Sequence, residues 1–280
     1  MNEPCHQRAG PKPEWAMGVV AVAVAAFVIS SCQTAPVTHR NQLILMDRGT
    51  ELSLGREIYQ DVKDHSPLVN DPRLISLVER VGDKIARAAG GEEYQWEFIL
   101  VDSETPNAYC IPGGKVVVNT GILPVAKTEA GLAAIIAHEA GHAMARHGAE
   151  RHGHAHIVTL GADLVARGLG QKLAEKTKMR LALGLDFLFS LAFPFSKTHE
   201  LEADEIGLTY MARAGYDPRE ALYLWERFLE LDESKKRPFL EFLSTHPTDK
   251  TRIQKLMILI PTAMREYNKS PRLGKGEDIL

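Results

Sequence analysis

The sequence His138-Glu139-Ala140-Gly141-His142 constrains this chain more than any other feature. We expect it to lie in an amphipathic helix that Thr128 caps and that runs through Arg146. Two histidines four residues apart share one helical face, so both imidazoles can point at one metal ion. Glu139 lies about 100° further round the helix, close to the metal but displaced from it, which suits a base rather than a ligand. The alternative is an accidental match, with both histidines hydrogen-bonded inside a helical core.

A third ligand decides between these interpretations. In metzincins a glycine and then a third histidine follow the motif, but the corresponding positions here hold Ala145 and Gly148. The other solution is a glutamate from a later helix, and Glu200 meets that requirement. We therefore predict that His138, His142 and Glu200 bind the metal.

The residues around Glu200 support such a site. Asp204 follows Glu200 by one helical turn and shares its face, whereas Glu202 points elsewhere. Ala203 and Gly207 lie along the same stripe, so this helix can approach the motif helix closely. An acidic residue on a face of small side chains is unusual for a solvated helix and natural for a metal site.

Together these motifs resemble those of the M48 metallopeptidases, over roughly residues 45–265. The matches are HExxH, the ExxxD spacing of Glu200 and Asp204, His246-Pro247 with Arg252, and Asn107-Ala108-Tyr109 before Pro112-Gly113-Gly114. The resemblance implies a zinc metalloendopeptidase with one Zn²⁺ per chain, in which Asp204 orients a zinc-binding histidine. It also implies the fold class: a mainly helical α+β, gluzincin-like domain with a small β-sheet beside the HExxH helix. The bacterial periplasmic lipoprotein proteases are the most similar subgroup.

The expected mechanism is peptide hydrolysis by an activated water. Glu139 accepts a proton from the water and passes it to the leaving amine. His246 and Arg252 are candidates to stabilise the oxyanion, although Arg252 could equally be a surface charge near a helix start. Because His246 lies on an expected loop, it could instead act as a fourth zinc ligand that keeps the protease latent.

An expected hairpin precedes the zinc helix and offers a place for substrate. Residues 107–111 and 115–119 read as strands on either side of a Pro-Gly-Gly turn. An extended peptide can add to the strand that contains Asn107, Ala108 and Tyr109, presenting its backbone to the metal. The alternative is an ordinary hairpin that closes a small sheet.

The N-terminal segment resembles a lipoprotein signal peptide. Residues 1–31 carry two basic residues, then an apolar run that is short for a bilayer span. The sequence before Cys32 resembles the bacterial lipobox, which predicts a lipidated Cys32 and a membrane association through that anchor. An uncleaved membrane anchor is the alternative. Gln33, rather than aspartate, favours the outer membrane, so we expect a periplasmic lipoprotein of the bacterial cell envelope.

The rest of the chain divides into three parts. We expect a tether at residues 32–46, the protease domain at 47–267 and a frayed polar tail at 268–280. Within the domain, apolar residues at helical spacing predict helices at about 47–64 and 72–89.

Composition limits the partners and the metal ligands. A net charge of −3 gives no basic excess for nucleic acid. Cys5, Cys32 and Cys110 form no CxxC pair, so the metal must use nitrogen and oxygen ligands.

The histidine-rich run at 147–156 is expected to be a solvated loop. The apolar stretch at 181–195 is expected to be a buried helix pair rather than a membrane-facing lid.

Two functions fit these features. The first is an endopeptidase that attacks misfolded or misassembled polypeptides of the cell envelope. The second is an envelope assembly factor or chaperone with latent protease activity. The full ligand set and Glu139 favour the first. No feature of the sequence predicts an oligomeric state.

Overall fold

The computed structural model describes residues 32–91, 93–155, 157, 195–233, 240–247 and 249–279. The expected signal peptide at residues 1–31 and residues 181–194 of the apolar stretch lie outside this part of the chain. Among the described residues, no helix combines the length and the apolar character that a membrane crossing requires.

Two capped helices open the domain. Helix α2 (Arg48–His65) begins at Asp47, whose side chain accepts a hydrogen bond from the backbone amide of Thr50. Helix α3 (Pro72–Ala89) begins at Asp71 in the same way and has the bounds that the sequence predicts.

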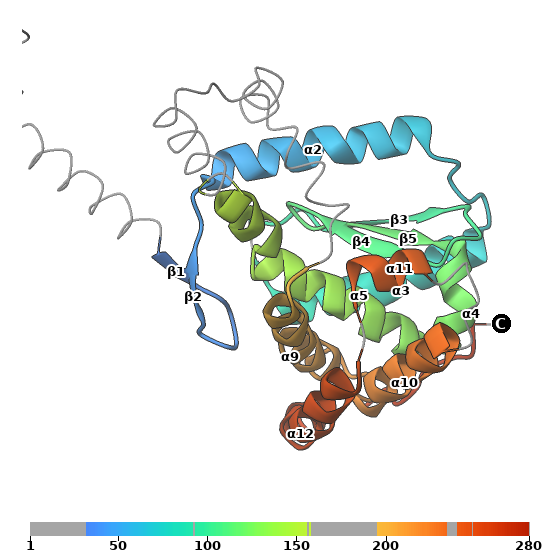
Figure 1. The fold of residues 1–280 in the computed structure, drawn as a ribbon. Coiled ribbons are helices and arrows are strands. Elements are labelled where there is room, and N and C mark those ends of the chain that lie inside the picture. The colour runs from blue at the N-terminus through green and yellow to red at the C-terminus, as the bar shows by residue number, and fades with distance from the viewer. Residues whose placement is uncertain are drawn as a thin grey trace, which may run out of the picture.

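A three-stranded sheet lies between α2 and the remaining helices (Figure 1). Its strands are β3 (Glu97–Val101), β4 (Ala108–Ile111) and β5 (Lys115–Asn119), in the order β3-β5-β4. Strand β5 pairs parallel with β3 and antiparallel with β4, so the predicted hairpin is confirmed. Because successive side chains alternate, Val117 packs with Tyr59 of α2, while its neighbours Val116 and Val118 join the main core.

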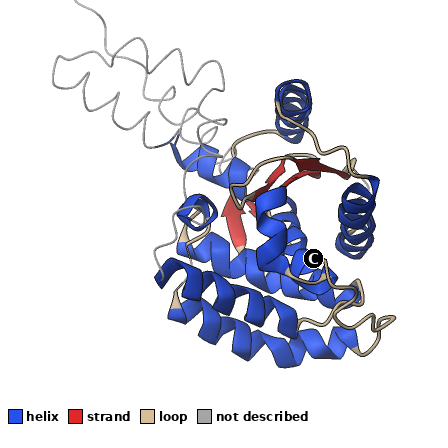
Figure 2. Ribbon diagram, turned by 90° about the vertical axis from the view of Figure 1, so that its right-hand side faces the viewer, coloured by secondary structure: helices blue, strands red, loops and turns tan. Residues whose placement is uncertain are grey.

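The main core is helical, and the strands form a small part of the chain (Figure 2). A 3₁₀ turn (Thr120–Ile122) and α4 (Leu123–Ala126) connect the sheet to α5 (Glu129–Met144). Residues 147–155 are also helical, and after residue 195 the described chain forms α9 (Lys197–Arg213), α10 (Arg219–Glu233), α11 (Leu240–Thr245) and α12 (Lys250–Tyr267). The predicted fold class, mainly helical with a small sheet beside the HExxH helix, is confirmed.

The segment expected to be a tether is instead a hairpin that packs on the domain. Strands β1 (Cys32–Thr34) and β2 (Asn41–Leu43) pair antiparallel and lie beside α9 in Figure 1. Gln42 is buried and donates hydrogen bonds to the carbonyl of Ala145 and to Glu150. Sequence alone missed this packing because the partners of Gln42 lie more than a hundred residues away.

The polar tail is ordered rather than frayed. The backbone amides of Glu129 and Ala130 donate to the carbonyls of Glu277 and Lys275, at 2.9 and 3.0 Å. Ile279 at the end of the tail is 2% exposed. The tail therefore satisfies amides in the first turn of α5, which have no partner inside their own helix.

Candidate active site

Helix α5 holds the HExxH motif rigidly. Thr128 caps the helix by accepting a hydrogen bond from the Gly131 amide. His138, Glu139 and His142 are all less than 5% exposed. The motif therefore lies in the interior and not on a solvated helix surface.

Helix α9 crosses α5 at very short range. A methyl group added at Gly141 would lie 2.7 Å from the carbonyl oxygen of Ala203, and one at Gly207 would lie 3.0 Å from the backbone of Ala137 and His138. The predicted close approach of the two helices is confirmed, and it requires glycine on both of them.

This approach brings Glu200 to the two histidines. Its Oε1 lies 3.3 Å from Nε2 of His142, and its Oε2 lies 3.4 Å from Nε2 of His138. His246, just after α11, joins them: its Nδ1 lies 3.3 Å from Nε2 of His138 and 3.2 Å from Oε1 of Glu200. One ligand atom from each of the four residues lies within 4.8 Å of the others. Imidazole nitrogens and a carboxylate oxygen, all buried, are the donor set that zinc accepts.

The charge states of His142 and Glu200 suit a metal site. The pKa of His138 is instead raised to about 9, because Asp204 and Glu200 outweigh the opposing effects of burial and Arg252, so a metal must displace its proton. Burial holds the pKa of His142 well below its usual value, which keeps the imidazole neutral. Burial opposes ionisation of Glu200, but the guanidinium of Arg252 and the neighbouring His246 hold its pKa well below the usual range. A neutral imidazole and an ionised carboxylate are the forms that bind zinc.

Glu139 lies beside this four-residue cluster. Its Oε1 is 3.4 Å from Nε2 of His246, and its carboxylate accepts a hydrogen bond from the backbone amide of Cys110 in β4. Burial raises the pKa of Glu139, although His246 and His138 oppose the shift. A carboxylate with a raised pKa is a more effective base near neutral pH than an ordinary glutamate.

Arg252 contacts the carboxylates of α9. Its Nε and Nη2 donate to the two oxygens of Asp204 at 2.6 and 2.8 Å, and Nη1 lies 2.7 Å from Oε2 of Glu200. Asp204 in turn lies 2.9 Å from Nδ1 of His138. The guanidinium stacks 3.4 Å above the ring of Trp225. Arg252 is thus a fully buried residue, and the alternative of a surface charge is wrong.

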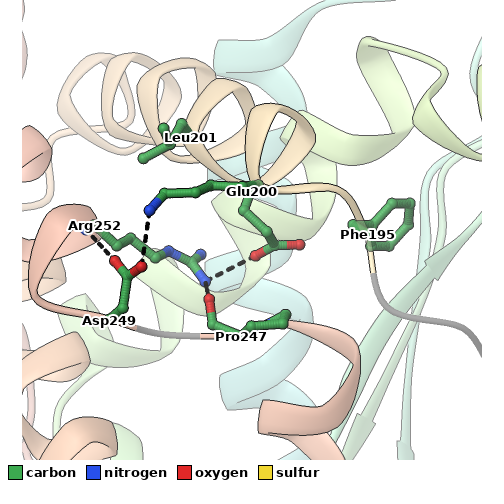
Figure 3. A pocket seen from close by; sticks show the side chains of 7 residues that line it. Phe195, Glu200, Leu201, Pro247, Asp249 and Arg252 are labelled. Atoms are coloured by element: carbon green, nitrogen blue, oxygen red, sulfur yellow. Dashed lines mark hydrogen bonds and ion pairs between the residues drawn. The ribbon is translucent and has the colours of Figure 1, made fainter.

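A cavity of about 130 Å³ lies against Glu200 and Arg252 (Figure 3). Phe195, Leu201 and Pro247 supply its apolar lining. At its rim Lys197 and Asp249 form an ion pair at 2.9 Å, which ties the start of α9 to the start of α12.

The remaining predicted residues lie in two places. Asn107, Ala108 and Tyr109 lie at and just before the start of β4, on the edge of the sheet that adjoins α5. Cys32 is exposed at the start of β1.

Sequence reasoning missed a set of polar residues behind the site. The run 147–156 was expected to be a solvated loop, but residues 147–155 are helical, and His147 and Glu150 are buried. The signal that could have found them is the concentration of histidines directly after the zinc helix.

An HExxH helix joined by a glutamate from a second helix defines a gluzincin-type metalloprotease site.

Comparison with known proteins identifies the family. The model of peptidase family M48 matches residues 72–259. Mitochondrial metalloendopeptidase OMA1 of Schizosaccharomyces pombe is 34% identical over 256 residues, which cover 89% of this chain and 73% of the relative. The protein of the same name from Saccharomyces cerevisiae is 31% identical over 267 residues, covering 89% and 75%. The Beta-barrel assembly-enhancing protease of Escherichia coli K12 is 29% identical over 252 residues, covering 84% of this chain and 50% of the relative. This chain belongs to peptidase family M48, and it is a zinc metalloendopeptidase.

The comparisons also correct one prediction. Relatives that are 31–39% identical to this chain are mitochondrial metalloendopeptidases from two yeasts and a plant. The prediction of a bacterial outer-membrane lipoprotein location is therefore wrong. It relied on a short motif before Cys32, and such short motifs occur by chance.

Proposed function

We propose that this metalloendopeptidase cleaves misfolded or misassembled polypeptides, with His138, His142 and Glu200 as its zinc ligands. The observation that carries the proposal is the buried four-residue cluster with Glu139 directly beside it. One relative is by name an assembly-enhancing protease, which supports a role in protein quality control.

Zinc, when bound, polarises the peptide carbonyl and makes a nearby water more acidic. Glu139 takes the proton of that water and delivers it to the leaving amine. Asp204 holds Nδ1 of His138, which leaves Nε2 directed at the metal. The guanidinium of Arg252 is engaged by the carboxylates of Asp204 and Glu200. We therefore assign Arg252 a positioning role and not direct contact with the oxyanion.

The test is cleavage of unfolded casein by the purified protein, with and without a zinc chelator. Glu139→Gln should abolish cleavage while zinc stays bound, because an amide cannot accept the proton. Glu79→Gln, an exposed position on α3, is the matched control and should cleave like the wild type. Chelator-resistant cleavage, or an active Glu139→Gln variant, would contradict the proposal. A protein that binds unfolded chains without cutting them would support the alternative of a chaperone or assembly factor.

His246 is proposed to hold the protease in a latent state. Its Nδ1 lies among the ligand atoms, where a fourth ligand would exclude water. It follows α11, so a rotation of this short segment would remove the imidazole and open the position. His246→Ala should raise the basal rate of casein cleavage. A large fall in turnover at unchanged zinc affinity would show that His246 acts only in catalysis.

Strand β4 is proposed to align the substrate. The outer edge of β3 is already engaged, since the carbonyl of Leu100 accepts a hydrogen bond from Val69. Strand β4 forms the opposite edge, and its Cys110 amide reaches Glu139. A photo-crosslinking residue at Tyr109 should capture casein in the Glu139→Gln background. The same residue at Ile99 of β3 is the control, because both side chains pack partly buried against α2. Equal capture at the two edges would exclude β4 as the substrate strand.

A further inference from the structure

A buried charged cluster lies behind His142, on the side away from the other metal-site residues. We call it the Arg40 cluster; its members are Arg40 before β2, His147 and Glu150 from the helical residues 147–155, and His199 and Glu202 from α9. His147 is 0% exposed, and both glutamates are at most 5% exposed. The catalytic steps proposed above use none of these residues.

A chain of contacts joins the hairpin to the metal site. Nε of Arg40 donates to Oε2 of Glu202 at 2.6 Å. The same oxygen lies 2.9 Å from Nε2 of His147, and Nδ1 of His147 lies 2.9 Å from Nδ1 of His142. His142 thus uses one nitrogen towards the metal-site cluster and the other towards His147.

Counting donors and acceptors along this chain fixes the tautomers. If Nε2 of His142 binds a metal, its neutral ring carries the proton on Nδ1 and donates it. Nδ1 of His147 must then accept, which places the proton of His147 on Nε2. The carboxylate of Glu202 accepts the hydrogen bond from this N–H. A ligating histidine commonly donates its other N–H to an acceptor. Here His147 is that acceptor, and Glu202 in turn holds His147.

Arg40 holds the two buried carboxylates of the cluster. Its Nη1 and Nη2 donate to both oxygens of Glu150 at 2.8 and 2.7 Å, while Nε serves Glu202. Glu150 is also bound by Nε2 of His199 at 3.1 Å. Buried carboxylates require a countercharge and directed donors, and the planar guanidinium supplies both in a fixed geometry. A lysine ammonium offers no such fork.

We propose that Arg40 is a positioning residue of the zinc site: the N-terminal hairpin fixes Glu202, and the Glu202–His147 pair orients His142 towards the metal. This inference rests on the proposed assignment of His142 as a zinc ligand. Its consequence is that zinc affinity depends on the contact between Arg40 and Glu202 in particular, and not on the other contacts by which the N-terminal segment packs on the domain.

The test is the zinc dissociation constant, measured on the full chain by competition with a chromogenic chelator. Removing the outer partner of a metal-binding histidine usually weakens metal binding about 10–100-fold, and Arg40→Ala, which acts through such a partner, should weaken zinc binding by up to that factor. Arg40→Lys keeps the charge without the fork and should lie between the wild type and Arg40→Ala. His147→Ala should weaken binding to a similar degree. The Arg40→Ala/His147→Ala double variant should lose no more than the stronger single variant, because both act through one chain of contacts.

A second arginine provides the matched control. Arg146 binds the same N-terminal segment through Gln33 and the carbonyl of Met46, at 2.7 and 3.0 Å, and it also pairs with Glu51. In the described part of the chain, the side-chain hydrogen bonds of Arg146 go to Glu51, Gln33 and Met46, and none goes to Glu202 or to the His147 ring. Arg146→Ala should therefore lower thermal stability without changing zinc affinity by more than about twofold.

Cobalt substitution separates positioning from general loosening of the fold. The visible absorption bands of Co²⁺ report ligand geometry, so they should change in Arg40→Ala and Arg40→Lys but not in Arg146→Ala. Wild-type zinc affinity and an unchanged cobalt spectrum in both Arg40 variants would overturn the inference, and so would additive losses in the double variant. Normal zinc binding by His142→Ala would instead refute the ligand assignment itself, so the two failures are distinguishable.

Discussion

Gly141→Ala adds one methyl group where the two helices that carry the proposed zinc ligands lie very close together. Its Cβ would lie 2.7 Å from the carbonyl oxygen of Ala203 and 3.1 Å from the Cα of the same residue. Carbon contacts are optimal at about 3.5–4.0 Å, so α5 and α9 would have to separate by roughly 0.5 Å. Both contacting atoms belong to the backbone, and no side-chain rotation can relieve the overlap.

Two opposing effects set the stability of this variant. Alanine favours a helix over glycine by about 1 kcal/mol. Overpacking of a tight interior costs about 1–3 kcal/mol. The expected net result is a loss of up to about 2 kcal/mol in the free energy of unfolding.

The effect on zinc should be larger than the effect on stability. Glu200 comes from α9 and both histidines come from α5, so a separation of roughly 0.5 Å exceeds the distance tolerance of about 0.2 Å at a zinc ligand. We expect zinc affinity to fall at least tenfold, measured by chelator competition alongside urea unfolding of the metal-free protein. Gly153→Ala is the control: it is helical, its new Cβ would lie 3.4 Å from Cγ of Leu45, and it should bind zinc normally. If Gly141→Ala bound zinc as tightly as Gly153→Ala, the helix spacing would not determine the site.

Three further predictions concern the metal, the tail and the N-terminal cysteine. Removing zinc with a chelator should lower the melting temperature. Zinc at 100 times its dissociation constant contributes about 2.7 kcal/mol to the free energy of unfolding, and each kcal/mol shifts the melting temperature of a chain of this size by about 2–4 °C. An unchanged melting temperature would argue against a bound metal. Ile279→Ala should cost about 2–5 kcal/mol in urea unfolding, because the side chain is 2% exposed and its backbone amide bonds to Lys127; a change below about 0.5 kcal/mol would mean that the tail is frayed after all. Cys32 is still predicted to carry a lipid, as the lipoprotein-type subgroup requires. This prediction concerns the modification and not the compartment. Intact-mass spectrometry of the mature protein showing an unmodified Cys32 would exclude it.

Local signals explain what the sequence could predict. Helix α3 has the predicted bounds because Asp71, Pro72 and Gly90 mark its ends within a few residues of the chain. The approach of Glu200 to the HExxH helix follows from helical spacing, with Gly207 on the same face allowing close packing. The chemistry of a metal site also restricts which residue types can meet there.

Long-range polar pairing explains what the sequence could not predict. From its sequence neighbours alone, His147 resembles a solvated histidine. In the folded chain, Glu202 of α9 accepts its hydrogen bond. Arg40 lies in a segment that resembles a linker, and its buried partner Glu150 is 110 residues away. No local pattern marks such pairs, because the stabilisation depends on burial that only the assembled fold creates.

The zinc content of Glu200→Ala, purified beside Glu139→Gln and measured by mass spectrometry of the metal, tests the central claim most directly. Glu200 is the anionic residue among the four that can hold the metal, so its removal should lower the zinc content well below one per chain even though three histidines remain. Glu139 is assigned as the base, so Glu139→Gln should retain about one zinc per chain. Full zinc occupancy in Glu200→Ala, or loss of zinc from Glu139→Gln alone, would contradict the assignment of the site.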